Sequence, residues 1–232
     1  MAPRHGGYLV QLTVSNMDPS PPPVKPRPYD ASRRRAHAGR RRAAIVEAAA
    51  DLFVANGYAG TTVSRVARAA GVSDETVFKA FGGKSGLVRA VWERGLEGLG
   101  DIPAEHRSDA HRASAGTAEA LLEGWGRLTA EVSPRTAPIL LLLRAAASVD
   151  GEAADVLEAA DRSRLERMEV NARGFVERGF ACPGTTVDQV RDVLWTYSAP
   201  ELYDLLVVRR GWTVDGYAGF VTTGLKAALL PG

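Results

Sequence analysis

Cysteine, histidine and methionine are scarce in this chain, which has one Cys, four His and three Met among its 232 residues. The single cysteine, Cys182, cannot form an internal disulfide bond, and four histidines without a cysteine cluster make no structural zinc site. The longest apolar run, 137–143, ends at Arg144 and is far shorter than the roughly 20 residues of a membrane helix. We therefore expect a cytoplasmic protein with no disulfide framework, no membrane partner and no metal or other cofactor.

Recognisable catalytic motifs are lacking as well. The Gly-Lys-Ser triplet at 83–85 resembles the end of a nucleotide-binding loop, but Phe78 stands where that pattern needs a glycine. His106 and His111 fall on different faces of a helix, which argues against a metal pair. Cys182 lies in a turn with Gly and Pro and has no histidine near it in the sequence, so no catalytic nucleophile is indicated. The sequence predicts a protein that is not an enzyme.

Charge is distributed unevenly, although the net charge is only +2. Residues 32–92 contain 11 Lys and Arg against 4 Asp and Glu, whereas residues 93–232 contain 15 against 21. A basic block joined to an acidic block suggests two domains with different partners, and the basic one requires a polyanion. Two arginine triplets, 33–35 and 40–42, open the basic block. We interpret them as an arm that touches phosphates; the alternative is a solvated charge run at a helix start.

Apolar residues recur with a helical period, and no segment shows the alternation that is typical of strands. Between residues 41 and 98 the periodic segments are short and are separated by glycines. Thr61 or Thr62 is expected to cap the second segment and Ser73 the third, because a hydroxyl accepts a hydrogen bond from the first turn of a helix. A short middle helix with a tight turn describes a helix-turn-helix at about 62–81, within an all-α fold.

A proline-containing stretch interrupts the helical pattern in the middle of the chain. Residues 118–132 form one amphipathic segment. Ser133-Pro134 and then Thr136-Ala137-Pro138 are signals for a helix start. They predict a separate helix that runs through Ala147.

Capping signatures mark the helices toward the C-terminus. A long helix is expected from about 152 to 178. Capping boxes are predicted at 186–189 and 198–201, and the second implies a break near Ala199 before Pro200. Thr213 is expected to cap the last helix.

Many positions at fixed spacing match a known pattern within residues 44–91. The matching residues are the runs 48–53, 56–58, 61–63, 66–73 and 76–81, together with Lys84 and Leu87. In these residues the segment closely resembles the DNA-binding domain of the TetR family of bacterial transcriptional regulators. The rest of the chain is similar only in being a helical region of suitable length, which in this family binds varied ligands. The resemblance implies an N-terminal three-helix helix-turn-helix DNA-binding domain followed by a helical ligand-binding and dimerisation domain.

The resemblance also implies which residues contact DNA. Residues 74–80 match the family's recognition helix, which enters the major groove. Phe78 stands where the family usually has tyrosine, so a phosphate hydrogen bond is lost. Asp74 and Glu75 repel phosphates, so they face base edges or point away from DNA, and the sequence leaves both readings open. The implied DNA-binding residues are Thr62, Ser64, Arg65, Ser73, Asp74, Glu75, Thr76, Phe78, Lys79 and Lys84.

Aromatic residues of the C-terminal region suit either a packed core or a ligand cavity. Each aromatic residue taken alone is interpreted more simply as part of the core or of the dimer interface. Together they indicate a mostly apolar cavity for a small apolar or aromatic effector. Arg144, at the end of a leucine run, is either a surface residue or a polar anchor in that cavity. The predicted ligand-binding residues are Trp125, Arg144, Trp195 and Tyr197.

Three regions follow from these patterns. Residues 1–36 are predicted to be a disordered, basic and Pro-rich tail, within which Met17 is an alternative start to Met1. Residues 37–98 are the predicted DNA-binding domain, and residues 99–232 the effector-binding and dimerisation domain.

The resemblance implies a homodimer in which helices at roughly 186–210 and 213–230 pair between subunits. Two recognition helices related by a two-fold axis read a palindrome, which one short helix cannot do. We expect a sequence-specific, ligand-responsive repressor that binds a palindromic operator in double-stranded DNA. The alternative is a constitutive architectural or non-specific DNA-binding protein whose C-terminal domain only dimerises.

Overall fold

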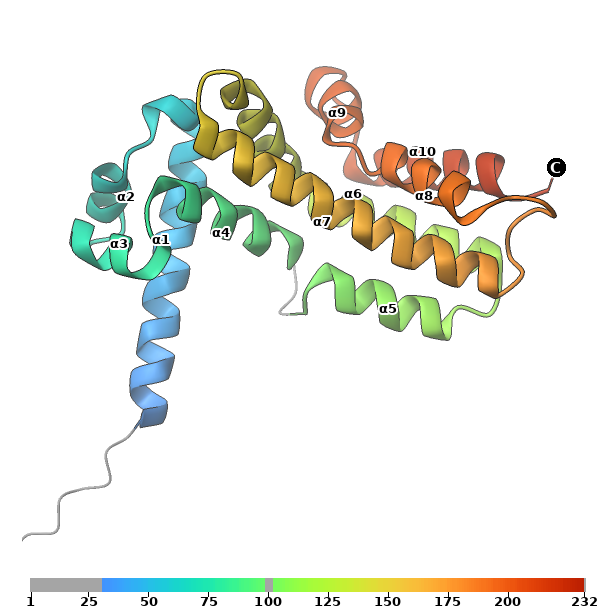
Figure 1. The fold of residues 1–232 in the computed structure, drawn as a ribbon, viewed down its shortest axis with the longest axis horizontal. Coiled ribbons are helices and arrows are strands. Elements are labelled where there is room, and N and C mark those ends of the chain that lie inside the picture. The colour runs from blue at the N-terminus through green and yellow to red at the C-terminus, as the bar shows by residue number, and fades with distance from the viewer. Residues whose placement is uncertain (1–30, 99–101, 232) are drawn as a thin grey trace, which may run out of the picture.

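The computed structural model describes residues 31–98 and 102–231, and every regular element among them is helical (Figure 1). The predicted tail before residue 31 therefore lies outside the described residues. The helices are α1 (Ala31–Gly60), α2 (Val63–Ala69), α3 (Asp74–Phe81), α4 (Lys84–Leu96), α5 (Ala104–Ser114), α6 (Ala118–Ala147), α7 (Gly151–Glu177), α8 (Val187–Tyr197), α9 (Pro200–Tyr203), the π-helical η1 (Asp204–Arg209) and α10 (Val214–Leu229). The all-α fold class predicted from the sequence is confirmed.

Helices α1 to α4 form the N-terminal unit, in which α2 and α3 pack beside the C-terminal half of α1 (Figure 1). The N-terminal half of α1 extends away from the rest of the molecule. Gly57, with φ 71°, kinks α1 near its end, a backbone conformation that favours glycine. The buried residues that join these helices include Phe53, Val66, Val77 and Leu87, all fully buried.

Helices α6 and α7 form a long antiparallel pair that runs through the C-terminal unit (Figure 1). α10 and α8 pack against this pair, and α5 contacts both α6 and α7. The hydrophobic cluster of the N-terminal unit continues through α4 into the α6–α7 end, where Leu140, Leu143 and Val156 are buried. α4 therefore belongs to both units by its packing.

The structure differs from the sequence prediction at the start of α1 and within α6. α1 begins at Ala31, so residues 31–36, assigned to the tail, are helical. α6 is one helix and contains both Pro134 and Pro138, so the predicted separate start is wrong. The Ser133 and Thr136 hydroxyls donate to carbonyls one turn back, at 2.6 and 3.0 Å, instead of capping a new helix. Burial of one face of α6 outweighs a cost of about 3 kcal/mol per proline.

The helix starts at Thr62, Ser73, Thr186 and Thr213 are confirmed, since each side chain accepts a backbone N–H of the first turn. The break at Ala199 is also present. The capping box at 198–201 is wrong: Ala199 precedes Pro200 without a side-chain cap, and the Ser198 hydroxyl donates to the Trp195 carbonyl.

Candidate functional site

The helix-turn-helix presents α3 on the surface of the N-terminal unit. The Thr62 hydroxyl caps α2 and the Ser73 hydroxyl caps α3, accepting from the Arg65 and Thr76 amides at 3.3 and 3.2 Å. The buried side chain of Val77 anchors α3 against α2. The orientation of α3 is thus fixed by packing on one face, which leaves the opposite face open.

The exposed face of α3 carries Glu75, Phe78 and Lys79. Phe78 is 53% exposed, whereas the adjacent Val77 is buried. Asp74 accepts a hydrogen bond from the Ser64 hydroxyl, so its carboxylate is turned toward α2. The structure therefore gives Asp74 and Glu75 different surroundings, which the sequence alone did not distinguish.

Other predicted DNA-binding residues have structural contacts of their own. The Arg65 guanidinium donates to the Gly60 carbonyl at 2.7 Å and to Asn56 at 3.2 Å, which fastens α2 to the end of α1. The Lys84 ammonium lies 3.8 Å above the Tyr58 ring. Burial, with Asp150 and Glu152 nearby, raises the pKa of Tyr58 to about 12.

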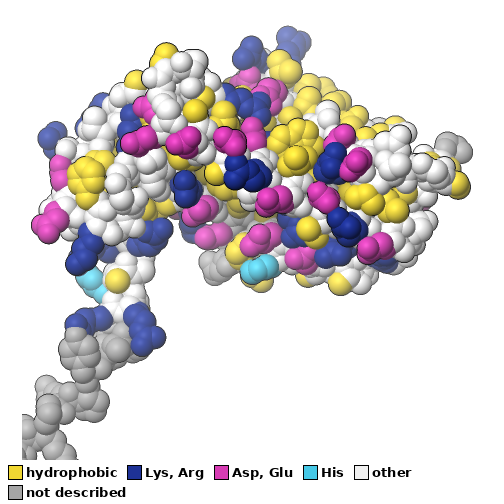
Figure 2. Space-filling view, in the orientation of Figure 1, with side chains coloured by type: hydrophobic (Ala, Val, Ile, Leu, Met, Phe, Trp, Pro, Cys, Tyr) yellow, Lys and Arg dark blue, Asp and Glu magenta, His cyan; other side chains and the backbone are white. Residues whose placement is uncertain are grey.

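The start of α1 extends away from α3 and carries Arg side chains, whereas the middle of α1 lies beside α3 (Figure 1 and Figure 2). The Arg42 guanidinium donates to the Ala80 carbonyl at 3.1 Å and lies 4.3 Å above the Phe81 ring. This contact ties α1 to the C-terminal end of α3, and no pattern in the sequence indicates it. The exposed basic residues before Arg42 are Arg34, Arg35, His37, Arg40 and Arg41.

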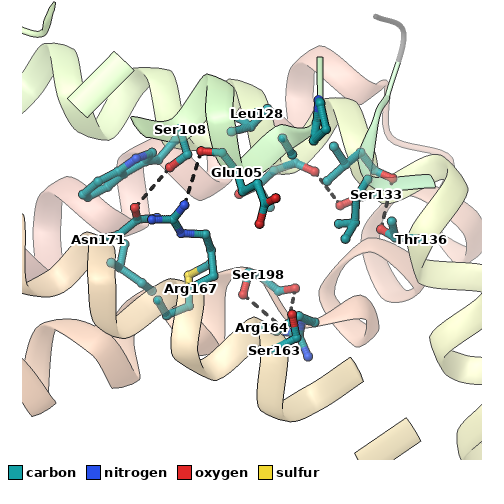
Figure 3. A pocket seen from close by; sticks show the side chains of 18 of the residues that line it. Glu105, Ser108, Leu128, Ser133, Thr136, Ser163, Arg164, Arg167, Asn171 and Ser198 are labelled. Atoms are coloured by element: carbon teal, nitrogen blue, oxygen red, sulfur yellow. Dashed lines mark hydrogen bonds between the residues drawn. The ribbon is translucent and has the colours of Figure 1, made fainter. Parts of the chain in front are cut away.

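A cavity of about 810 Å³ lies in the C-terminal unit, between α4, α5, α6, α7 and α8 (Figure 3). This volume is within the range of sites for drug-sized molecules. Trp125 and Tyr197 line the cavity, whereas Arg144 and Trp195 do not. Arg144 forms ion pairs with Glu201 and, at 3.7 Å, with Asp161. The Trp195 ring stacks under the Arg164 guanidinium at 4.2 Å.

Buried polar side chains form part of the cavity wall and were missed in the sequence. Ser108 and Asn171, both nearly fully buried, are joined by a 3.1 Å hydrogen bond (Figure 3). Ser133 and Thr136 line the same cavity and are buried as well. The Trp92 side chain on α4 lines the cavity and belongs to the core of the N-terminal unit, so one helix connects the two sites.

Two further properties concern metals and membranes. Within residues 31–98 and 102–231, no three His, Cys, Asp or Glu side chains cluster in a way that could hold a metal ion. Over the same residues, none of the helices combines the length and the hydrophobicity that crossing a membrane requires.

A known family and a known sequence each match part of the chain. The family described as "Bacterial regulatory proteins, tetR family" matches residues 45–91. YvkB of Bacillus subtilis (strain 168), an uncharacterized HTH-type transcriptional regulator, is 34% identical over 79 residues. That match covers 34% of this chain and 42% of YvkB, so less than half of the relative's length is compared.

Solved structures share the fold of about four fifths of the chain. The fatty acid degradation regulator FadR from Bacillus halodurans is similar with a TM-score of 0.66 and 16% identity, over 81% of this chain and 94% of its own. FadR from Bacillus subtilis, in complex with stearoyl-CoA, has a TM-score of 0.64 and 17% identity, over 80% and 96%. At these identities the likeness shows the fold. The matched family and its relatives are transcriptional regulators and not enzymes. The N-terminal unit is thus similar to the TetR family of bacterial regulatory proteins over residues 45–91, and the solved structures show a shared fold.

Proposed function

We propose that this protein is a ligand-responsive transcriptional repressor that binds a palindromic DNA operator as a homodimer. One observation carries the proposal: α4 begins directly after the α3 helix and forms, through Trp92, part of the cavity wall. A ligand that alters the position of α4 therefore acts on α3 through direct packing. Binding to DNA places the protein in the cytoplasm, with the chromosome.

The DNA-binding surface is α3 with its exposed Phe78 and Lys79, together with the N-termini of α2 and α4. Backbone amides at helix N-termini donate to phosphates, and the exposed face of a short helix fits the major groove. Thr62, Ser73 and Thr76 hold the helix starts in place, while Glu75 is free to face base edges. The arginines of α1 lie on the same side of the unit as the end of α3, since Arg42 bonds to Ala80.

The dimer interface is proposed at η1 and α10, where exposed apolar side chains gather. Five of the eleven large apolar side chains that are exposed among the described residues lie within 205–220 (Figure 2). Trp212 and Phe220 meet edge to face at 6.0 Å, and Tyr197 extends this aromatic group from α8. Such a patch on a protein surface marks an interaction site. A two-fold pairing there presents two α3 helices to successive half-sites.

The direction of the switch follows from linkage. A ligand lowers DNA affinity only if it prefers the geometry that does not bind DNA. Inverting a 1:99 population to 99:1 takes roughly 10⁴-fold preference, or about 5.5 kcal/mol. The stearoyl-CoA complex of FadR from Bacillus subtilis shows that a protein of this fold holds a ligand.

Footprinting on the DNA next to the coding gene tests the proposal. We expect a discrete protected palindrome; uniform coating without preference would instead support the constitutive, non-specific binder.

Lys79→Ala is expected to weaken binding to all DNA sequences. The slope of log affinity against log salt is negative, and each lost phosphate contact makes it less steep by about 0.9. Arg127→Ala, an exposed residue of α6, is the control and should leave the slope unchanged. An unchanged slope for Lys79→Ala would remove this residue from the interface.

A further inference from the structure

We propose that the cavity takes an amphipathic organic cation, with an apolar or aromatic body and one positively charged ammonium group. The regulatory consequence of this binding depends on the function proposed above, whereas the binding itself does not. The proposal concerns the charge of the side chains that line the cavity and the partners they already have.

Acidic side chains outnumber basic ones around the cavity. Carboxylates come from α4, α5 and α7, and the basic residues are two arginines of α7. The C-terminal unit as a whole is also acidic, because residues 93–232 hold 21 Asp and Glu against 15 Lys and Arg. The five lining carboxylates are Glu93, Glu97, Glu105, Asp109 and Glu166.

The terminal nitrogens of both arginines of the lining donate to protein groups, whereas the buried Nε of Arg167 has no hydrogen-bond partner. Arg167 donates to the Glu105 carbonyl at 3.3 Å and to the Asp109 carboxylate at 2.9 Å. Arg164 pairs with Asp161 at 2.9 Å and donates to the Ser198 carbonyl and hydroxyl. An anionic ligand would compete with Asp109 and Asp161 for these two guanidinium groups, because the described part of the lining has no other Lys or Arg.

Three of the five carboxylates are not paired with an arginine. Asp109 is paired with Arg112 and Arg167, which hold its pKa below the ordinary value, and Glu97 is paired with Arg94. Glu93 and Glu166 have no hydrogen-bond or ion-pair partner among the described residues.

Glu105 supplies the third available charge. It has only His106, at 3.8 Å, as a side-chain partner within the described part of the chain, and its carboxylate points into the cavity in Figure 3. An ammonium group entering beside these three carboxylates gains attraction from each of them.

The three carboxylates without an arginine partner are solvent-exposed lining residues and form the acidic mouth of the cavity, and the interior beyond this mouth suits an apolar or aromatic body. Trp92, Trp125, Leu128, Val132 and Leu140 contribute to its wall. Indole faces also attract cations, by about 0.5–2 kcal/mol in typical sites. Apolar walls with an uncompensated negative mouth are complementary to an amphipathic cation and repel a ligand with phosphate groups.

The proposed ligand also contacts the helix that reaches the DNA-binding unit. Glu93 lies beside Trp92 on α4, and Trp92 packs in the core of the N-terminal unit. A cation held by Glu93 therefore acts on α4 directly.

Calorimetric titration of the full chain with probes of equal tail length tests the proposal. The probes are decyltrimethylammonium, decanoate and decanol, all used below micelle formation, with decanoyl-CoA as a fourth. We expect decyltrimethylammonium to bind at least about tenfold more tightly than decanoate. The two probes differ only in their head groups, and the carboxylates of the lining attract the cationic one. Stronger binding of decanoate or decanoyl-CoA, or no binding of decyltrimethylammonium, would overturn the proposal.

The double variant Glu93→Gln/Glu166→Gln keeps the side-chain shape and removes two charges. We expect it to bind the cation about fivefold more weakly and decanol unchanged, since exposed charge pairs contribute modestly. The control is Glu119→Gln/Glu177→Gln, two acids outside this cavity, and its affinity should match the wild type. If the cavity variant and the control variant bound the cation with equal affinity, the charges of Glu93 and Glu166 would have no role in binding and the proposal would be refuted.

DNA binding without ligand is measured separately in the same preparations. If the protein binds the cation but does not bind DNA, only the proposed repressor function is contradicted. If the protein binds DNA but does not bind the cation, only the inference of a cation site is contradicted.

Discussion

Gly86 lies in the first turn of α4, against the last residue of α3. A Cβ placed on Gly86 would lie 1.7 Å from the Phe81 carbonyl oxygen, which is backbone and cannot rotate away. Gly83, just before α4, has φ 146°, a conformation that side chains rarely adopt. These two glycines set the close approach of α4 to α3, on which the orientation of α3 depends.

Gly86→Ala is expected to push α4 away from α3 and to weaken DNA binding about tenfold or more. Forcing a methyl group into a filled contact costs about 1–3 kcal/mol. Thermal unfolding should show the same loss as a lower Tm. The control is Gly151→Ala, since a Cβ there meets nothing within 4 Å. Wild-type DNA affinity in Gly86→Ala would show that α3 does not depend on this contact.

Tyr217 provides a test of burial by its titration. It is fully buried, and burial raises the pKa of its hydroxyl to about 12. Because the pKa of an unfolded tyrosine is about 10, the native state holds the proton more tightly, so stability is complete below pH 10 and falls as pH rises from about 10 to about 12. A pKa that is higher by one in the folded state than in the unfolded state corresponds to about 1.4 kcal/mol of unfolding free energy.

Tyr217→Phe has no hydroxyl to ionise, so its unfolding free energy should fall less between pH 10 and 12 than that of the wild type. Tyr58→Phe should behave similarly, because the pKa of Tyr58 is also raised to about 12. Denaturant unfolding at pH 8, 10, 11 and 12 measures the difference. Parallel wild-type and Tyr217→Phe curves would mean that the hydroxyl ionises as easily in the folded state.

At the scale of elements, local signals were predictable and tertiary ones were not. The caps at Thr62, Ser73, Thr186 and Thr213 depend on a hydrogen bond within three residues, so the sequence alone indicates them. The continuity of α6 depends on the packing of α4, α7 and α10 against it, which no local pattern contains.

The N-terminal extension of α1 is an element with a prediction of its own. The triple variant Arg35→Gln/Arg40→Gln/Arg41→Gln keeps helix propensity, because Gln and Arg are similar in that respect. We expect weaker binding to every DNA sequence, with the slope of log affinity against log salt reduced by about 1 to 3, as each phosphate contact contributes about 0.9. A fluorescence anisotropy titration at several salt concentrations measures it.

The control for the arm replaces three exposed arginines of the C-terminal unit with Gln, namely Arg127, Arg162 and Arg173. It removes the same charge and should change the slope much less. If the two triple variants behaved alike, the effect would belong to net charge and the arm would have no specific contact.

At the scale of the whole molecule, the cavity shows what a sequence pattern leaves out. Of the four residues predicted to bind a ligand, Trp125 and Tyr197 line the cavity, and ligand binding by them stays a prediction. Arg144 and Trp195 were named with them because of residue type, yet they lie in an ion-pair and stacking group outside the lining. Ser108, Asn171 and Glu93 come from three different helices, α5, α7 and α4, and tertiary packing brings them to one cavity.

Val208→Glu tests the proposed dimer. Val208 is 62% exposed in η1, beside Leu205 at 48%. A buried unpaired carboxylate in a subunit interface costs several kcal/mol, so we expect a monomer in sedimentation velocity and loss of palindrome binding. Helical content and Tm should change little, because the side chain is exposed within one subunit. Val149→Glu, at an 89% exposed position in the α6–α7 turn, is the control and should remain dimeric. If Val208→Glu dimerises and protects the palindrome as the wild type does, the two-fold axis must lie at another surface.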